Sequence, residues 1–348
     1  MTFLVGFVGL VIFLLIPTEA YAWGPATHLR FASEVLVNLQ MLEPALRTLL
    51  AAYPYDYLYG NLAADLILGK KHVDYRLHCH NWDVAFDVLE KAPADPQKAF
   101  MWGYISHLSA DTIAHNIFIP SQVLRDDAPR GFKHAYWEVR YDSKAEHHVW
   151  NLAGKIQKFV DPRNDDLLVM QLDETILPHR INKMIFNSML FVNNFDQWRK
   201  AVETINDRST WRFHPQDSYR YDHLVMNSIF DMLRNQKDSH TYHNDPTGQR
   251  MLDLAVKLHK EGRRLKKKPD YDKEMHFKEL APILEFDFPV KHYTELYPDR
   301  HPGSGGAMLK ALEPSFLYEQ LDNPRDYAPG YINFLQERNF LHLVGGNK

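Results

Sequence analysis

Apolar residues recur at helical spacing along most of this chain. Between residues 31 and 50 they fall three and four positions apart, which places them on one face of a helix. The same spacing recurs in segments 84–89, 99–117, 135–159, 181–192, 224–233, 251–258 and 308–321, whereas alternating strand patterns are scarce. Prolines such as Pro54, Pro96 and Pro120 fall between these segments and indicate helix boundaries. The sequence therefore predicts an all-α, multi-helix bundle with long connecting loops.

The first 22 residues have the features of an export signal. A fourteen-residue apolar run covers residues 3–16, which suits a signal peptide and is short for a membrane-spanning helix. Ala20 and Ala22 follow at the spacing of a signal-peptidase site. No Lys or Arg precedes the run, so an uncleaved membrane anchor is the alternative. We expect residues 1–22 to be removed after Ala22 and the mature protein to be exported, either periplasmic or secreted.

Charge and cysteine content limit what the mature chain can bind and how it can be stabilised. Forty Lys and Arg stand against 44 Asp and Glu, and the formal net charge of −4 gives no general attraction to nucleic acid. The single cysteine, Cys79, excludes an intrachain disulfide. We expect one main domain over residues 23–267 and a helical C-terminal extension of unknown role over residues 268–348.

The strongest chemical signal is a run of three polar residues in an apolar helical segment. His107, Asp111 and His115 stand four positions apart. Residues at i and i+4 share a helix face, about 5–6 Å apart, so adjacent members of the run can reach one metal ion. His107 and His115 lie about 12 Å apart along the axis, which is too far to share an ion. This spacing predicts that Asp111 bridges two metals and that His115 serves a further one.

Other candidate ligands flank this segment in the sequence. His134 and Glu138 form a second i, i+4 pair. Together with His115 they give the three-ligand set of an open zinc site. Upstream, Asp65 offers a carboxylate, and His80 an imidazole for which His78 competes. Each residue alone is more often a hydrogen-bonded core or surface residue. An acidic residue between two histidines in an apolar helix, however, needs a counter-charge or a metal.

Cleavage of the export signal would create one more ligand. Removing residues 1–22 leaves Trp23 as the first residue, with a free α-amino group five positions before His28. That amine, the carbonyl oxygen of the same residue and a nearby imidazole can together chelate a metal. Export would then complete the site.

In this order the residues resemble the zinc-dependent phospholipase C family, which is related in fold to the S1/P1-type single-strand nucleases. The family pattern is an N-terminal Trp, a His, an Asp, a His, His-x3-Asp, a His and then His-x3-Glu or His-x3-Asp. The resemblance covers residues 23 to about 160 by motif and extends to about 260 by helical content. The nine matching positions are Trp23, His28, Asp65, His80, His107, Asp111, His115, His134 and Glu138.

The resemblance implies a bundle of the phospholipase C/P1 nuclease type with three zinc ions. The implied ligand sets are Asp65, His80, His107 and Asp111 for one ion, Trp23, His28 and Asp111 for a second, and His115, His134 and Glu138 for a third. His80 is favoured over His78 because His80-Asn81-Trp82-Asp83 resembles the family's local sequence. The gap between Asp111 and His115 is shorter than in the family's bacterial prototypes, which affects the expected substrate more than the expected metals.

The implied activity is that of a secreted phosphoric diester hydrolase, most simply one acting on phospholipids by attack of a metal-bridging hydroxide on phosphorus. Asp65 and Asp111 are the expected catalytic residues, with Asp65 orienting or deprotonating the water. A lipid substrate would bring peripheral membrane contact, and the slight acidity of the chain makes nucleic acid the less favoured partner. The alternatives are a single-strand nuclease or nucleotidase of the same fold, a non-catalytic metal-stabilised binding protein, and a structural protein anchored by a retained N-terminal run.

Overall fold

The fold is all-α in the part of the chain that the structure describes. The computed structural model describes residues 23–65, 79–125, 136–138, 140–145, 147–153, 156, 159–171, 183 and 215–265. The elements are α2 (Pro25–Val37), η1 (Leu39–Met41), α3 (Pro44–Ala52), α4 (Pro54–Ala63), α5 (Trp82–Lys91), α6 (Asp95–Ile113), η4 (Ala114–Phe118), α7 (Ile119–Arg125), α9 (His147–Ala153), α10 (Arg163–Gln171), α13 (Pro215–Asn235), η6 (Gln236–Asp238) and α14 (Gln249–Leu265). Residues 136–138 and 140–142 are helical as well.

Several predictions concern positions outside these described residues. They are the signal segment 1–22, the two histidines His78 and His134, the helical segment 308–321, all of 181–192 except Lys183, and the extension 268–348. Within the described ranges, no helix is both long enough and apolar enough to cross a membrane.

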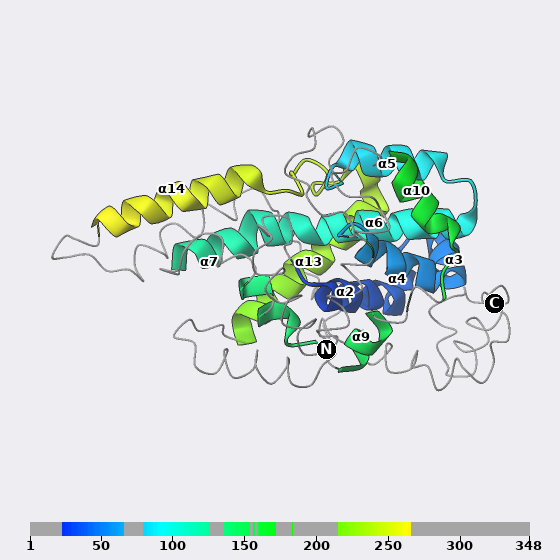
Figure 1. Ribbon diagram of the computed structural model, residues 1–348, viewed down its shortest axis with the longest axis horizontal. Helices are drawn as coiled ribbons and strands as arrows, with labels where there is room; N and C mark the ends of the chain where they lie inside the picture. Colours follow the sequence, from blue (N-terminus) through cyan, green and yellow to red (C-terminus); the bar gives the residue numbers. More distant parts are fainter. Residues whose placement is uncertain are drawn as a thin grey trace, which may run out of the picture.

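Helix α6 is the centre of the bundle. Figure 1 shows α6 and α7 crossing the molecule as one long rod, and α4, α5 and α13 pack against α6 while α14 runs along α7. Every residue from Ala99 to Ile113 is buried, as expected for a helix surrounded by other helices. Ser106, Ser109 and Thr112 donate their hydroxyls to carbonyls four residues earlier. His107 and Asp111 are the buried ionisable pair of this stretch, and their side chains meet partners from other elements.

The crossing of α4 over α6 is unusually close, because a glycine stands on each helix at the contact. A Cβ at Gly60 would lie 2.9 Å from the carbonyl carbon of Phe100 and closer still to its oxygen. A Cβ at Gly103 would lie 2.9 Å from the carbonyl carbon of Tyr57, again closer to the oxygen. The two backbones touch at this crossing, and that contact brings the C-terminal end of α4 against His107.

Prolines mark helix starts as predicted at two positions, but the structure differs from the sequence prediction in segment 31–50 and at Pro120. Pro54 and Pro96 stand in the first turn of α4 and α6, where a missing N–H leaves no bond unmade. The periodic segment 31–50 is divided by η1 into α2 and α3. Pro120 does not break the helix: the chain passes through the π-helix η4 into α7. The wider π turn, with Ile119 N–H donating to the Ala114 carbonyl, relieves the clash that a proline ring causes with the preceding turn.

A partly buried ion pair joins the N-terminal helix α2 to α13. Arg30 donates from both terminal nitrogens to the Asp222 carboxylate, at 3.0 and 2.5 Å, and the Tyr141 hydroxyl donates to the same carboxylate at 2.6 Å. The three side chains satisfy one another in a fork geometry that suits a guanidinium. The pair fixes α2, which carries a candidate ligand, relative to the rest of the bundle.

Asp56, in the first turn of α4, gives a pH-dependent prediction. Burial raises the pKa of Asp56 to about 6 from 3.8, although its carboxylate accepts from the Asp161 N–H and the Asn164 amide. The folded state then holds this proton more tightly than the unfolded state, so folding stability falls as pH rises from about 4 through 6. We expect Asp56→Asn, which stays neutral and keeps the acceptor oxygen, to gain up to about 3 kcal/mol over the wild type between pH 4 and pH 7.

Denaturant unfolding of both metal-free proteins across this pH range checks the prediction. Other titrating groups contribute equally to both proteins, so the difference in unfolding free energy isolates Asp56. A difference that stays constant between pH 4 and 7 would show that the carboxyl does not titrate there.

Candidate metal centre

Five of the predicted ligands meet around α6. His28 lies on α2, Asp65 follows the end of α4, and His80 precedes α5, while the other two stand on α6 itself. All five are at most 3 % exposed: His28, Asp65, His80, His107 and Asp111. Three imidazoles and two carboxylates buried together are the donor types that bind zinc.

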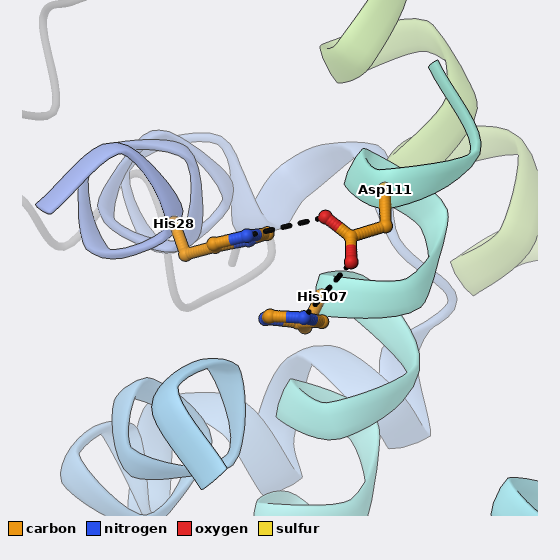
Figure 2. A group of neighbouring side chains, drawn as sticks. All are labelled: His28, His107 and Asp111. Carbon is orange, nitrogen blue, oxygen red and sulfur yellow. Dashed lines mark ion pairs between the residues drawn. The ribbon is translucent and has the colours of Figure 1, made fainter. Parts of the chain in front are cut away.

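Asp111 stands at the middle of this cluster, with a different set of imidazoles on each carboxylate oxygen. Oδ1 lies 3.3 Å from His28 Nε2, and Oδ2 lies 2.8 Å from His80 Nε2 and 3.2 Å from His107 Nε2. Figure 2 shows the Asp111 carboxylate at the edge of the His28 and His107 rings, with one oxygen toward each ring; His28 comes from α2 and His107 from α6 itself. The arrangement is that of a carboxylate able to bridge two ions.

The protonation of His107 shows that these contacts are not simply hydrogen bonds. Its Nδ1 lies 2.8 Å from the carbonyl oxygen of Asn61, and because a carbonyl only accepts, Nδ1 carries a proton. In the neutral ring, Nε2 is then a lone pair, yet it faces Asp111 Oδ2 at 3.2 Å and His80 Nε2 at 3.3 Å. A lone pair on His107 Nε2 that faces an ionised carboxylate oxygen at 3.2 Å needs a cation, or an added proton, between the two atoms. The residues present therefore fit a bound metal ion.

His28 supports the same conclusion on the other side of the carboxylate. Its ring stacks on that of His107, with centroids 3.7 Å apart and planes 16° from parallel. Within the described part of the chain, neither of its ring nitrogens makes a hydrogen bond, although Nε2 lies 3.3 Å from Asp111 Oδ1. A buried imidazole without a hydrogen-bond partner is rare unless an ion completes its environment.

Two groups of three residues have donor atoms close enough to hold an ion. One is His28, His107 and Asp111, and the other is Asp65, His80 and His107, each with its atoms within 4.8 Å of one another. Asp65 Oδ1 lies 3.6 Å from His80 Nε2 and 3.7 Å from His107 Nε2. The family resemblance implied His107 as a ligand of one ion, whereas the structure makes it a member of both groups.

The pKa shifts of Asp111 and His28 favour the protonation states that bind a cation. Burial by itself would raise the pKa of Asp111, but His107, together with His28 and His80, holds that pKa well below its usual range. Burial, followed by the nearby His107, lowers the pKa of His28. An ionised carboxylate and a neutral imidazole are the forms that ligate zinc.

The N-terminal end of α2 is held by Asp142, a residue that the sequence did not single out. Thr27 donates to Asp142 Oδ1 from its N–H at 2.8 Å and from its hydroxyl at 2.6 Å. This carboxylate acts as the N-cap that the local sequence lacks, and it stands where a Cβ on Gly24 would have to go. It thereby fixes the turn that leads into His28. No local motif predicts it, because the two partners are 115 positions apart.

Trp23 is anchored on the same helix as Asp111. Its side chain is fully buried, its Nε1 donates to the Ala110 carbonyl at 3.2 Å, and its ring packs on Phe118 and Tyr141, with centroids 4.5 and 4.1 Å away. Trp23 is thus bonded to the residue that directly precedes Asp111. The role of its amino group stays a prediction.

The third predicted ligand set is only partly within the described residues. His115 lies on the π-helix η4 and is 2 % exposed, and its ring centroid is 6.4 Å from that of His80. Glu138 is 4 % exposed, and its neighbour Trp137 packs edge-on against Phe118 of η4. His134 lies outside the described residues, so a third site stays a prediction.

Asn81, which directly follows His80, caps the next helix. Its side-chain oxygen accepts from the Asp83 and Val84 N–H groups, at 2.8 and 3.4 Å. It is the N-cap of α5. Asn81 thus contributes indirectly, by fixing where α5 begins and hence where His80 stands.

Comparison with known families agrees with this geometry. The profile of the family described as zinc dependent phospholipase C matches residues 27–205, just over half of the chain. The matched region contains the whole ligand pattern from His28 to Glu138. Searches of curated proteins and of solved structures gave no significant match. The matched family and the helical architecture confirm the predicted family and fold class.

Proposed function

Because the chain belongs to the zinc-dependent phospholipase C family, we propose that it hydrolyses the phosphodiester bond of phospholipids at this cluster. The observation that supports this most directly is the position of Asp111, with His28 on one oxygen and His80 and His107 on the other. A carboxylate placed in this way would hold two ions at the short separation that phosphoryl chemistry uses.

The ligand sets proposed are those implied by the family pattern. Asp65, His80, His107 and Asp111 would hold one zinc, with Trp23, His28 and Asp111 holding a second and His115, His134 and Glu138 a third. Zinc bound there would supply a Lewis acid that makes water acidic and neutralises charge on phosphoryl oxygens.

The chain's own residues would then organise the reaction. Asp65 stands at the edge of the cluster, 3.6 Å or more from the imidazoles it faces, and is the carboxylate proposed to orient the attacking water and accept its proton. Asp111 keeps its charge throughout and holds the two sites at a fixed spacing. His107 is kept in one tautomer by the Asn61 carbonyl, so its Nε2 always faces the cluster.

Substrate turnover by the purified protein tests the proposed function. We expect phosphatidylcholine vesicles to release diacylglycerol and a phosphorylated headgroup, with the activity lost on chelation and restored by zinc. Cleavage of single-stranded DNA without lipid turnover would instead assign a nuclease of the same family fold. Absence of turnover of either substrate by the zinc-loaded protein would indicate a non-catalytic binding protein.

Export completes the proposed function, because only cleavage after Ala22 frees the Trp23 amine. The burial of Trp23 beside Ala110 supports a position close to Asp111. We expect a protein that begins at Trp23 to bind about three zinc ions, and the same protein with one extra Met in front to bind one fewer or to bind it more weakly.

Mass spectrometry of both proteins under native conditions measures the zinc count, and N-terminal sequencing of the exported protein identifies the cleaved bond. The pair differs by a single residue at a blocked amine, so folding changes little between them. Equal zinc affinity in the two proteins would remove the amine from the ligand set.

A further inference from the structure

The loop from Asn244 to Gly248, which joins η6 to α14, closes over His115. The ring Nδ1 of His115 lies 2.6 Å from the carbonyl oxygen of Pro246. The side-chain amide of the next residue, Asn116, donates to the Asp245 carbonyl at 2.8 Å and to the Thr112 carbonyl at 2.8 Å. Two consecutive residues of the π-helix are therefore bonded to two consecutive carbonyls of one loop.

The contact with Pro246 determines the tautomer of His115. A backbone carbonyl has no proton to give, so His115 Nδ1 must carry the proton of that hydrogen bond. In the neutral ring, Nε2 then carries the lone pair, which is the form that can ligate a metal. His107 is oriented in the same way by the carbonyl of Asn61, at 2.8 Å.

The loop is itself held in place at both ends. Trp82, two residues after His80, donates its Nε1 to the Asn244 carbonyl at 2.8 Å. The Asp245 carboxylate accepts from the Thr247 N–H at 2.9 Å and from the Thr247 hydroxyl at 2.6 Å, which closes a tight turn around Pro246. The carbonyls that face η4 cannot rotate away without breaking these bonds.

Gly248 allows the loop to lie directly on His115. Its φ of +57° is in the left-handed region that favours glycine. A Cβ at this position would lie 2.5 Å from the carbonyl carbon and oxygen of His115 and closer still to its Cβ. A side chain here would therefore push the loop and η4 apart.

We propose that the loop Asn244–Gly248 is a positioning element that fixes the tautomer and direction of His115 for the third zinc ion. The loop lies beyond residues 27–205, the region matched by the family profile. The inference rests on the proposed function, since it requires His115 to be a zinc ligand.

Four variants of the full exported protein test the loop. Asp245→Ala removes the acceptor that closes the turn, whereas Asp245→Asn keeps an oxygen for the Thr247 N–H and is the conservative rescue. Gly248→Ala forces the loop away from η4. Asp238→Ala, at an exposed position in the same connection, is the matched control.

Zinc affinity, measured by chelator competition, is the first readout. We expect Asp245→Ala and Gly248→Ala to weaken one zinc site by about 10- to 100-fold and leave the others unchanged. Asp245→Asn and Asp238→Ala should match the wild type. If Gly248→Ala does not fold, the Asp245 pair still decides the outcome.

Nuclear magnetic resonance of protein with ¹⁵N-labelled histidine is the second readout, and it does not depend on activity. His115 should show a protonated Nδ1 in the metal-free wild type, and Asp245→Ala should give a mixture of tautomers. A merely structural role for the loop would lower stability without changing the tautomer.

His115→Ala, measured in parallel, separates failure of this inference from failure of the proposed third site. If His115→Ala loses one zinc while Asp245→Ala and Gly248→Ala keep wild-type affinity, the loop does not position the ligand. If His115→Ala itself keeps every zinc, both the third site and its positioning loop are overturned, whereas the sites around Asp111 stand.

Discussion

Asp111→Asn is expected to abolish hydrolysis and to remove zinc from two sites at once. The asparagine has nearly the same shape, but its amide offers one ligating oxygen and a nitrogen that cannot ligate, so it cannot bridge. It also removes the negative charge from between three buried imidazoles. We expect at least about a thousandfold loss of turnover, because several kcal/mol of transition-state stabilisation depend on the two ions.

Zinc analysis and turnover of the same preparation check this prediction. Asp95→Asn is the matched control, since Asp95 stands in the first turn of the same helix, is exposed and pairs with Lys98 at 3.1 Å. The control should keep full zinc and full activity. Asp65→Asn should lose one site and not two, because Asp65 faces His80 and His107 but belongs to one group only. Zinc retention by Asp111→Asn equal to the wild type would refute the bridging role.

The part of the site that the sequence predicts best is the part made by local geometry. His107 and Asp111 are four residues apart on a helix, and that spacing alone places a histidine nitrogen near a carboxylate, as the 3.2 Å contact shows. Asp65, His80 and His28 join them from other parts of the chain: His28 from α2, and the other two from the segments that follow α4 and precede α5. Their approach could be inferred only from the order of residue types along the chain, because no local rule fixes the distance between helices.

The backbone carbonyls that orient the imidazoles could not be predicted from the sequence. The carbonyls of Asn61 and Pro246 hold His107 and His115, and any residue type would supply the same oxygen. The Asn61 carbonyl belongs to the last turn of α4, where a helix leaves its acceptors without helical partners. A helix end at this position is therefore useful to the site, but the helical periodicity does not show it.

Hydrophobic periodicity could not predict the π-helix η4 either. A pattern spaced three and four residues apart assumes α-helical geometry, and one wide turn at 114–118 changes the direction of His115 without changing the pattern. Pro120 was the available signal: a proline inside a continuing apolar helix requires the preceding turn to widen or kink.

Gly103→Ala is expected to destabilise the protein by about 3 kcal/mol or more, although alanine is the better helix former. Helix propensity alone predicts a gain of about 1 kcal/mol for this change. The sign reverses because the added Cβ would lie 2.9 Å from the carbonyl carbon of Tyr57 and closer to its oxygen, and neither backbone can move without separating α4 from α6.

Separation of α4 from α6 would also disturb the metal centre. Asn61 is four residues beyond Tyr57 on α4, and its carbonyl lies 2.8 Å from His107 Nδ1. A shift of α4 away from α6 would lengthen this bond and move Asp65, so weaker zinc binding should accompany the loss of stability. The glycine contact thus links the packing of the bundle to the orientation of a ligand.

Denaturant unfolding of the metal-free protein and chelator competition for zinc measure the two effects in the same variant. Lys98→Gly serves as the control, because Lys98 is exposed on α6 and its pair with Asp95 contributes little. That change should cost about 1 kcal/mol through propensity alone and leave zinc affinity unchanged. A Gly103→Ala protein as stable as the wild type would mean that α4 can move away from α6 freely, and the close crossing would then not be what brings Asn61 to His107.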